Sequence, residues 1–200
     1  MPKVFLFPLN NSLLMKKVTL PYHIFEPRYL QMIQDAKDDD IELSVLYPLA
    51  SSNYRGKYVV AGKPLILRDG DTLDIVITGE KKYRLIEEVS SDPYLCYEAE
   101  VVNEVVSLNQ SDMYDYNTLK NILMNFLKSK NVEFSNPEFK RLLQDPEFVV
   151  SYATLFLIQS KVKRQEILDS MNLNEKINNV LDYLAKKKFP NIHLAPLMKK

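Results

Sequence analysis

The side chains best placed to do chemistry are one carboxylate and one guanidinium, Glu26 and Arg28, two positions apart in an aromatic stretch. Their aromatic neighbours are Tyr22, Phe25 and Tyr29. An acidic and a basic group at this spacing can form an ion pair that fixes a joint in the chain. The same residues can instead form a recognition surface, since aromatic side chains supply large contact areas. These five residues are therefore the candidate site, either for peptide binding or for a structural joint.

The sequence carries no motif of a nucleotide-hydrolysing enzyme. The segment from Gly56 to Pro64 imitates a phosphate-binding loop, but five residues separate its glycines where the motif has four. Pro64 also stands where the loop needs a hydroxyl group for magnesium, and a strand is predicted to follow instead of a helix. Nucleotide hydrolysis by this chain is therefore not expected.

Metal-ligating and nucleophilic residues share no motif either. His23 and His193 lie far apart, and the acidic cluster from Asp35 to Glu42 lacks the glycine and the spaced final glutamate of a calcium-binding loop. We interpret this cluster as a solvated loop. Cys96 is the single cysteine, which excludes an intrachain disulfide and a cysteine-based zinc site, and we interpret it as a structural thiol. We predict no catalytic residue, no metal and no cofactor.

A transition from strand to helix is expected to position the candidate site. Pro21 and Pro27 push the residues before them away from helical geometry, and Pro27 suits the first position of a helix. Apolar residues then recur at helical spacing, which predicts a helix over about residues 27–37. The transition from strand to helix is by itself enough to account for the prolines and the charges. The structural interpretation of Glu26 and Arg28 is therefore preferred.

The chain is predicted to be β-rich first and helical afterwards, an α+β fold. Residues 1–106 read as about seven short strands with the one helix, and their tight connections favour a closed or nearly closed antiparallel barrel. Residues 107–190 read as a helical subdomain, because the apolar period changes to that of a helix. Residues 191–200 are predicted to form a flexible tail.

Two glycines of the β-rich part have distinct predicted roles. Gly62 lies inside an extended segment over residues 57–68, where it indicates a bulge or a close approach of another backbone. Gly70 lies in the turn from Asp69 to Asp71, which we ascribe to its tolerance of a positive φ.

Charge and hydropathy restrict the partners. Acidic and basic side chains number 26 each, so the chain has no general attraction for phosphate backbones or anionic membranes, and nucleic acid is disfavoured. The cluster from Lys81 to Arg84 is basic and aromatic, but we interpret it as a hairpin end whose lysines discourage edge pairing. No apolar run approaches the roughly 18 residues of a membrane span, and no signal peptide is recognised. A cytoplasmic protein is expected.

Three parts of the sequence carry a resemblance to a known family. The first is Phe5–Leu9, followed by the stretch from Leu20 to Tyr29. The others are residues of the middle strands and of a helical segment, namely Gly79, Tyr83, Arg84, Ile86, Pro93, Tyr94, Glu98, Gln165–Leu168, Asn172, Ile177 and Leu181. Together they resemble the N-terminal, substrate-binding domain of the Lon family of ATP-dependent proteases. The sequence departs from the family at Met15–Lys17, where Pro-Gly is usual, so this turn is expected to differ.

The resemblance implies a PUA-like pseudobarrel followed by a helical bundle. It also implies a non-enzymatic module that binds unfolded or degradation-marked polypeptides in protein quality control or proteolysis. A stand-alone member of the family is expected, with a separate ATPase–protease as a further partner, since no ATPase or peptidase segment is recognised. The alternative is an RNA-binding PUA-like module, against which the neutral charge argues. A third reading, a small enzyme with scattered catalytic residues, has no motif in its favour.

Overall fold

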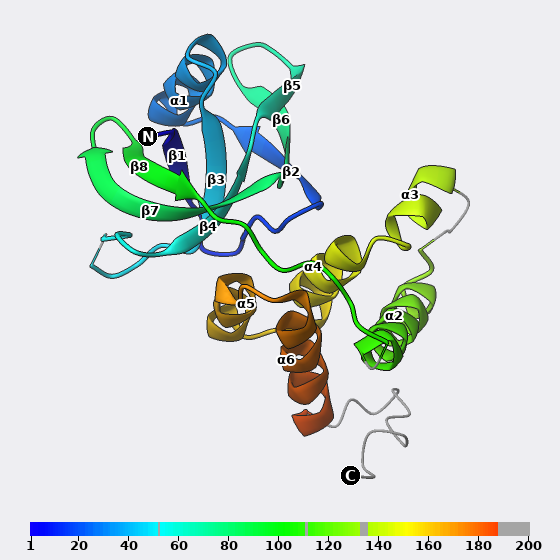
Figure 1. The fold of residues 1–200 in the computed structure, drawn as a ribbon. Coiled ribbons are helices and arrows are strands. Elements are labelled where there is room, and N and C mark those ends of the chain that lie inside the picture. Colours follow the sequence, from blue (N-terminus) through cyan, green and yellow to red (C-terminus); the bar gives the residue numbers. More distant parts are fainter. Residues whose placement is uncertain (52, 111, 133–135, 188–200) are drawn as a thin grey trace. The chain divides into compact units, whose positions relative to one another are not determined.

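The architecture consists of one unit built on strands and one built on helices (Figure 1). The computed structural model describes all residues except 52, 111, 133–135 and 188–200. Contacts divide the chain between Asn103 and Glu104. The domain limits predicted at residues 106 and 190 stay predictions, and the predicted tail lies outside the described residues.

The first unit contains a closed five-stranded barrel. Its strands, in the order in which they pair, are β1 (Lys3–Pro8), β3 (Glu42–Leu46), β4 (Tyr58–Gly62), β7 (Lys81–Ser90) and β8 (Leu95–Val101). The predicted closed barrel is confirmed, but the prediction that it is antiparallel throughout is wrong, because β1 and β3 pair in parallel. Connectivity gives the reason: a strand and a helix lie between β1 and β3, and such a crossover returns the chain in its original direction.

The remaining strands form a separate three-stranded sheet. They are β2 (Thr19–Ile24), β6 (Leu73–Thr78) and β5 (Pro64–Arg68), with β6 in the middle. The extended segment predicted over residues 57–68 is therefore two strands, β4 and β5, which belong to different sheets. Gly62 ends β4, and a Cβ atom there would stand 1.8 Å from the carbonyl oxygen of Thr78. The predicted close approach at Gly62 is confirmed.

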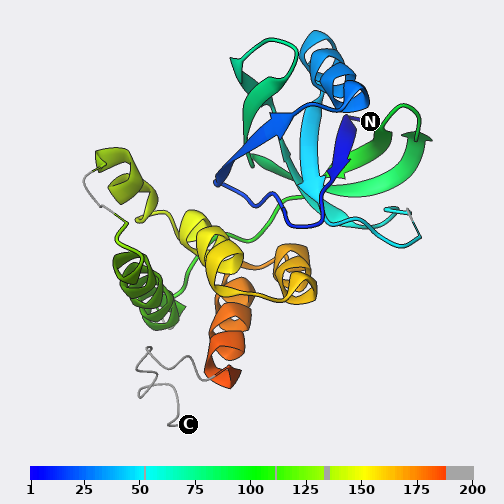
Figure 2. The same ribbon diagram turned by 180° about the vertical axis from the view of Figure 1, so that it is seen from behind.

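Helix α1 (Pro27–Asp38) begins at the proline that predicts it, with Glu26 as N-cap residue. The backbone of Glu26 is extended (φ −74°, ψ 130°), as a residue before proline requires. Met32, Ile33 and Ala36 are buried on the inner side of the helix. Helix α1 neighbours β1 and β5 (Figure 2). The helix predicted over about residues 27–37 is confirmed.

The turns use positive φ at positions that differ from the prediction. Among the described glycines it is Gly56 that has a positive φ, of 77°, so the ascription of the turn at residues 69–71 to positive φ at Gly70 is wrong. Lys17, in the turn over Met15–Lys17 that is expected to differ, has a φ of 65°. Its N–H donates to the carbonyl oxygen of Gly79 over 2.7 Å, and this bond holds the turn although the residue is not glycine.

The second unit is helical. Its helices are α2 (Asp112–Ser129), α3 (Pro137–Leu142), α4 (Pro146–Leu157), α5 (Lys161–Asp169) and α6 (Leu173–Lys186). Helices α3 to α6 each have an N-cap residue whose side chain accepts a hydrogen bond from a backbone N–H of the first turn. These N-cap residues are Asn136, Asp145, Ser160 and Asn172. Helices α4 and α6 pack against each other and each also contacts α2 and α5, which forms one apolar core.

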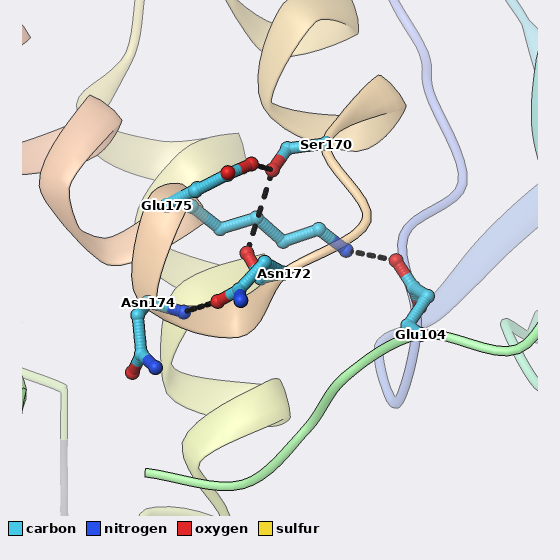
Figure 3. A network of polar contacts seen from close by, with 6 residues as sticks. Glu104, Ser170, Asn172, Asn174 and Glu175 are labelled. Carbon is cyan, nitrogen blue, oxygen red and sulfur yellow. Dashed lines mark hydrogen bonds and ion pairs between the residues drawn. The ribbon is translucent and has the colours of Figure 1, made fainter. Parts of the chain in front are cut away.

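The chain segment that enters this unit is docked on the start of α6 (Figure 3). We call residues 104–107 the docked segment. The N–H of Val105 donates to Met171 and its carbonyl accepts from Leu173, both over 2.9 Å. Lys176 forms an ion pair with Glu104, and their side chains are only 11% and 2% exposed. The docked segment is thus a built part of the helical unit.

Candidate functional site

The ion pair of Glu26 and Arg28 lies on the surface. Nη2 and Nε of Arg28 both donate to Oε2 of Glu26, over 2.9 and 3.1 Å. The side chains of Arg28 and Glu26 are 53% and 45% exposed. The guanidinium carbon of Arg28 also lies 4.5 Å from the centre of the Tyr29 ring, a cation–π contact.

The two tyrosines of the candidate site point into the unit. Tyr29 is only 8% exposed, and its ring centroid lies 4.4 Å from that of Phe7. Tyr22 lies 6.1 Å from the same phenylalanine, and its hydroxyl forms a 2.9 Å hydrogen bond with Ser12. Burial raises the pKa of Tyr22 to about 12 and also raises the pKa of Tyr29. Both rings therefore pack against Phe7 inside the unit.

Replacing Glu26 by alanine is expected to lower the free energy of unfolding by less than about 1 kcal/mol. An ion pair exposed to water stabilises the fold little, because water also solvates the two charges when they are apart. Glu42→Ala is the matched control, since Glu42 also forms an ion pair, with Lys81 over 2.6 Å, but has a side chain only 7% exposed. Urea unfolding followed by circular dichroism measures both. A larger loss for Glu26→Ala than for Glu42→Ala would contradict the surface assignment.

Phe25, by contrast, faces solvent beside a sheet that exposes further apolar side chains. Its ring is 64% exposed and lies 6.2 Å from that of His23. Leu65 and Leu67 on β5 are 61% and 63% exposed. Pro21 of β2 and Leu65 both lie opposite Val76 of the central strand, so an apolar row crosses the sheet. We call this side of the sheet the outer face, formed by Pro21, His23, Phe25, Leu65, Leu67, Arg68, Asp74 and Val76.

A charged row runs beside the apolar row on the outer face. Nδ1 of His23 lies 2.7 Å from one carboxylate oxygen of Asp74, and Nη2 of Arg68 lies 2.8 Å from the other. The hydrogen bond with His23 and the charge of Arg68 hold the pKa of Asp74 below its usual range. Arg68 thus neutralises the carboxylate of Asp74, as Arg28 neutralises that of Glu26. The outer face therefore presents apolar side chains beside charges that already have a partner.

Sequence reasoning finds Phe25 but misses the residues of the outer face on β5 and β6. A signal was present in the sequence. Val76 stands in the polar phase of a strand whose other phase is Leu73, Ile75 and Ile77, and residues 65–67 are apolar in both phases. An apolar residue in the solvent-facing phase of a strand indicates exposed apolar surface.

The basic cluster from Lys81 to Arg84 is built into the barrel. Strand β7 pairs with β4 on one side and β8 on the other, so the interpretation of its lysines as guards of an edge is wrong. Lys82 is 1% exposed, with its ammonium 5.1 Å from the centre of the Tyr58 ring. Arg84 pairs with Glu100 over 3.3 Å. Both charged side chains therefore interact with partners within the unit.

The other reactive side chains are likewise engaged. Cys96 is 5% exposed, and burial raises the pKa of its thiol, which makes it a poor nucleophile near neutral pH. Within the acidic cluster, Asp40 pairs with Lys63 over 2.5 Å and Asp35 accepts from the hydroxyl of Tyr94. Across the described residues, no three side chains of His, Cys, Asp or Glu are grouped so that they could hold a metal ion. None of the described helices combines the length and the apolar character that crossing a membrane requires.

Comparison with known proteins agrees with this architecture. The family model described as the ATP-dependent protease La (LON) substrate-binding domain matches residues 3–186. No curated protein sequence matches the chain. Among solved structures, a Lon N-terminal domain protein from Xanthomonas campestris is 18% identical with a TM-score of 0.68, covering 92% of this chain and 99% of that one. The N-terminal domain of the Mycobacterium avium complex Lon protease is 16% identical with a TM-score of 0.72, covering 92% and 98%.

These two structures share the fold of this chain, and the family model spans both of its units. The resemblance seen in the opening signature, the middle strands and the closing helical segment is thereby confirmed, as is the α+β fold class. The chain belongs to the family of Lon substrate-binding domains.

Proposed function

We propose that this chain is a non-enzymatic module that binds apolar segments of unfolded or degradation-marked polypeptides on its outer face. The observation that carries the proposal is the exposure of Phe25, Leu65 and Leu67 on one side of one small sheet. Large apolar side chains that gather on a surface are typical of a binding site for another polypeptide. The family, named for substrate binding, supports the same reading.

The charges of the outer face favour an uncharged, apolar ligand. Arg68 and Arg28 are occupied by Asp74 and Glu26, so a charged ligand would have to compete with an existing ion pair. The RNA-binding alternative depends on basic groups that neutralise phosphates, and the chain is neutral overall. In this proposal the module acts in cytoplasmic quality control, and a separate ATPase–protease degrades what it binds.

Replacing Phe25 and Leu65 together by serine is expected to weaken binding of a reduced, alkylated model protein at least tenfold. A tenfold loss corresponds to about 1.4 kcal/mol, which the removal of two exposed apolar anchors readily exceeds. Titration of the fluorescently labelled model protein, without ATP, gives the dissociation constants. Circular dichroism checks that the variant is folded.

The matched control is Val162→Ser, since Val162 is also exposed, at 70%, but lies on α5 of the helical unit. It is expected to leave the dissociation constant unchanged. If Phe25→Ser with Leu65→Ser binds as the parent does, the outer face is not the site. If the parent chain shows no saturable binding, and RNA binds with an affinity that falls steeply as salt rises, the RNA-binding alternative holds.

A further inference from the structure

The three-stranded sheet ends in two edge strands, β2 and β5, on either side of β6. An open edge of this kind is a common binding site for an extended polypeptide, which adds a strand through backbone hydrogen bonds. Whether an edge can do so depends on which N–H and C=O groups point outward from it. The register of the sheet decides this question.

Two prolines fix the direction of the backbone groups. Pro21 of β2 lies opposite Val76, and Pro64 of β5 lies opposite the next residue of the central strand, Ile77. Opposite residues in antiparallel strands alternate between pairs that exchange hydrogen bonds and pairs that do not. Since neighbouring residues of β6 bond to opposite sides, the two prolines are either both in hydrogen-bonded pairs or both in non-hydrogen-bonded pairs.

The contacts in the sheet indicate that both prolines are in non-hydrogen-bonded pairs. Proline has no N–H, so a hydrogen-bonded pair would lose a ladder bond at each of the two positions. Side chains lie closer together across non-hydrogen-bonded pairs. Two pairs in the phase of Pro21 show such close contacts: the hydroxyls of Thr19 and Thr78 are 2.8 Å apart, and His23 lies 2.7 Å from Asp74.

Each edge therefore lacks a donor where an added strand would need one. At the β2 edge the middle outward-facing position is Pro21, which has no N–H to offer. At the β5 edge Pro64 lacks the donor, Ile66 has one, and the register then shifts between Ile66 and Arg68. An added strand would leave a carbonyl group unpaired at either edge, at a cost of about 1–3 kcal/mol if that group is buried. Proline and a bulge are common devices against edge pairing.

We propose that the module recognises polypeptides through side-chain contacts on the outer face, without adding a strand to the sheet. The ligand class is then uncharged, apolar segments whatever the hydrogen-bonding capacity of their backbone, including segments that contain proline. The compensated ion pairs of Arg68 and Arg28 complement a ligand of this kind, because they leave the apolar row free of unbalanced charge. This inference rests on the proposed function and specifies its mode.

The test compares one apolar peptide rich in Leu and Phe with modified versions of itself, each titrated against the full chain by fluorescence anisotropy. In two versions the amide N–H of alternate residues is replaced by an ester oxygen, one version for each phase. Two further versions carry N-methyl groups at the same positions, and a last version has its apolar side chains replaced by serine. The backbone-modified peptides are expected to bind within about threefold of the parent, and the serine peptide at least tenfold more weakly.

Addition of a strand would give a different pattern. One phase of ester and N-methyl substitution would then weaken binding tenfold or more while the other phase had little effect, and this result would overturn the inference while leaving polypeptide binding intact. Failure of the parent peptide and of an unfolded model protein to bind would instead overturn the proposed function itself. The two failures are thus distinguishable in one set of titrations.

Discussion

Replacing Gly62 by alanine is expected to lower the free energy of unfolding by about 3 kcal/mol or more, beyond the usual cost of overpacking. The new Cβ would stand 1.8 Å from the carbonyl oxygen of Thr78, and the obstructing atom is backbone and not a side chain that can rotate away. Thr78 ends β6 in the other sheet, so relief of the clash requires the two sheets to separate locally. Urea unfolding followed by circular dichroism measures the loss.

Gly70→Ala is the matched control for this prediction. The nearest atom to a Cβ at that position is the carbonyl oxygen of Thr72, at 3.8 Å, and the φ of Gly70 is not positive. This substitution is expected to change stability by less than about 1 kcal/mol, and the smaller entropy of the unfolded chain favours stabilisation. Equal losses at Gly62 and Gly70 would show that close approach is not what requires glycine at position 62.

Lys176→Met is expected to destabilise the helical unit by about 3 kcal/mol, because removing one partner of a buried ion pair typically costs 3–5 kcal/mol. The side chain of Glu104 is 2% exposed and loses a cation, while methionine supplies a stem of similar shape. Hydrogen exchange measured by mass spectrometry should show faster exchange at Val105 and Leu173, whose N–H groups hold the docked segment.

Lys186→Met controls for the loss of a lysine from the same helix. Lys186 is exposed in the last turn of α6, where a cation is worth less than about 1 kcal/mol. Faster exchange restricted to the docked segment and the start of α6 is expected for Lys176→Met alone. If both variants lose the same small amount of stability, Glu104 does not depend on Lys176.

The helical starts could be predicted from the sequence because their chemistry is local. Asn136-Pro137 and Asp145-Pro146 each place a side-chain acceptor directly before a proline, and both begin helices. Pro27 likewise stands at the first position of α1, although the side chain of Glu26 before it makes no cap hydrogen bond. Such signals lie within a few residues of the element that they specify, so no knowledge of the tertiary fold is needed to interpret them.

The division of the strands between two sheets could not be predicted in this way. The alternation of side chains says which residues share a face, but it does not say which strand lies next to which. Apolar residues continue from β4 into β5 across Gly62 and Lys63, although the two strands pair with different neighbours. The parallel pairing of β1 with β3 likewise depends on partners that are distant in sequence.

The candidate site shows the same limit at the scale of single side chains. Tyr22, Phe25 and Tyr29 are all aromatic, and the sequence does not distinguish their environments. In the structure Tyr29 packs on Phe7, while Phe25 is 64% exposed. Their orientation depends on the phase of β2 and on the angle at which α1 leaves it. The other apolar residues of the outer face include Leu65 and Leu67 of β5 and Val76 of β6, two strands that lie far from Phe25 in the sequence.

The pairing of β1 on both sides has a consequence for folding during protein synthesis. Residues 3–6 pair with residues 95–98 of β8, so the barrel closes only after β8 has been made. Until then Val4, Phe5, Leu6 and Phe7, all buried in the barrel, form an apolar strand without its second neighbour. Contacts this distant in sequence form slowly, and exposed apolar strands promote aggregation in the meantime. We therefore expect the nascent chain to need protection at its N-terminus until β8 has left the ribosome.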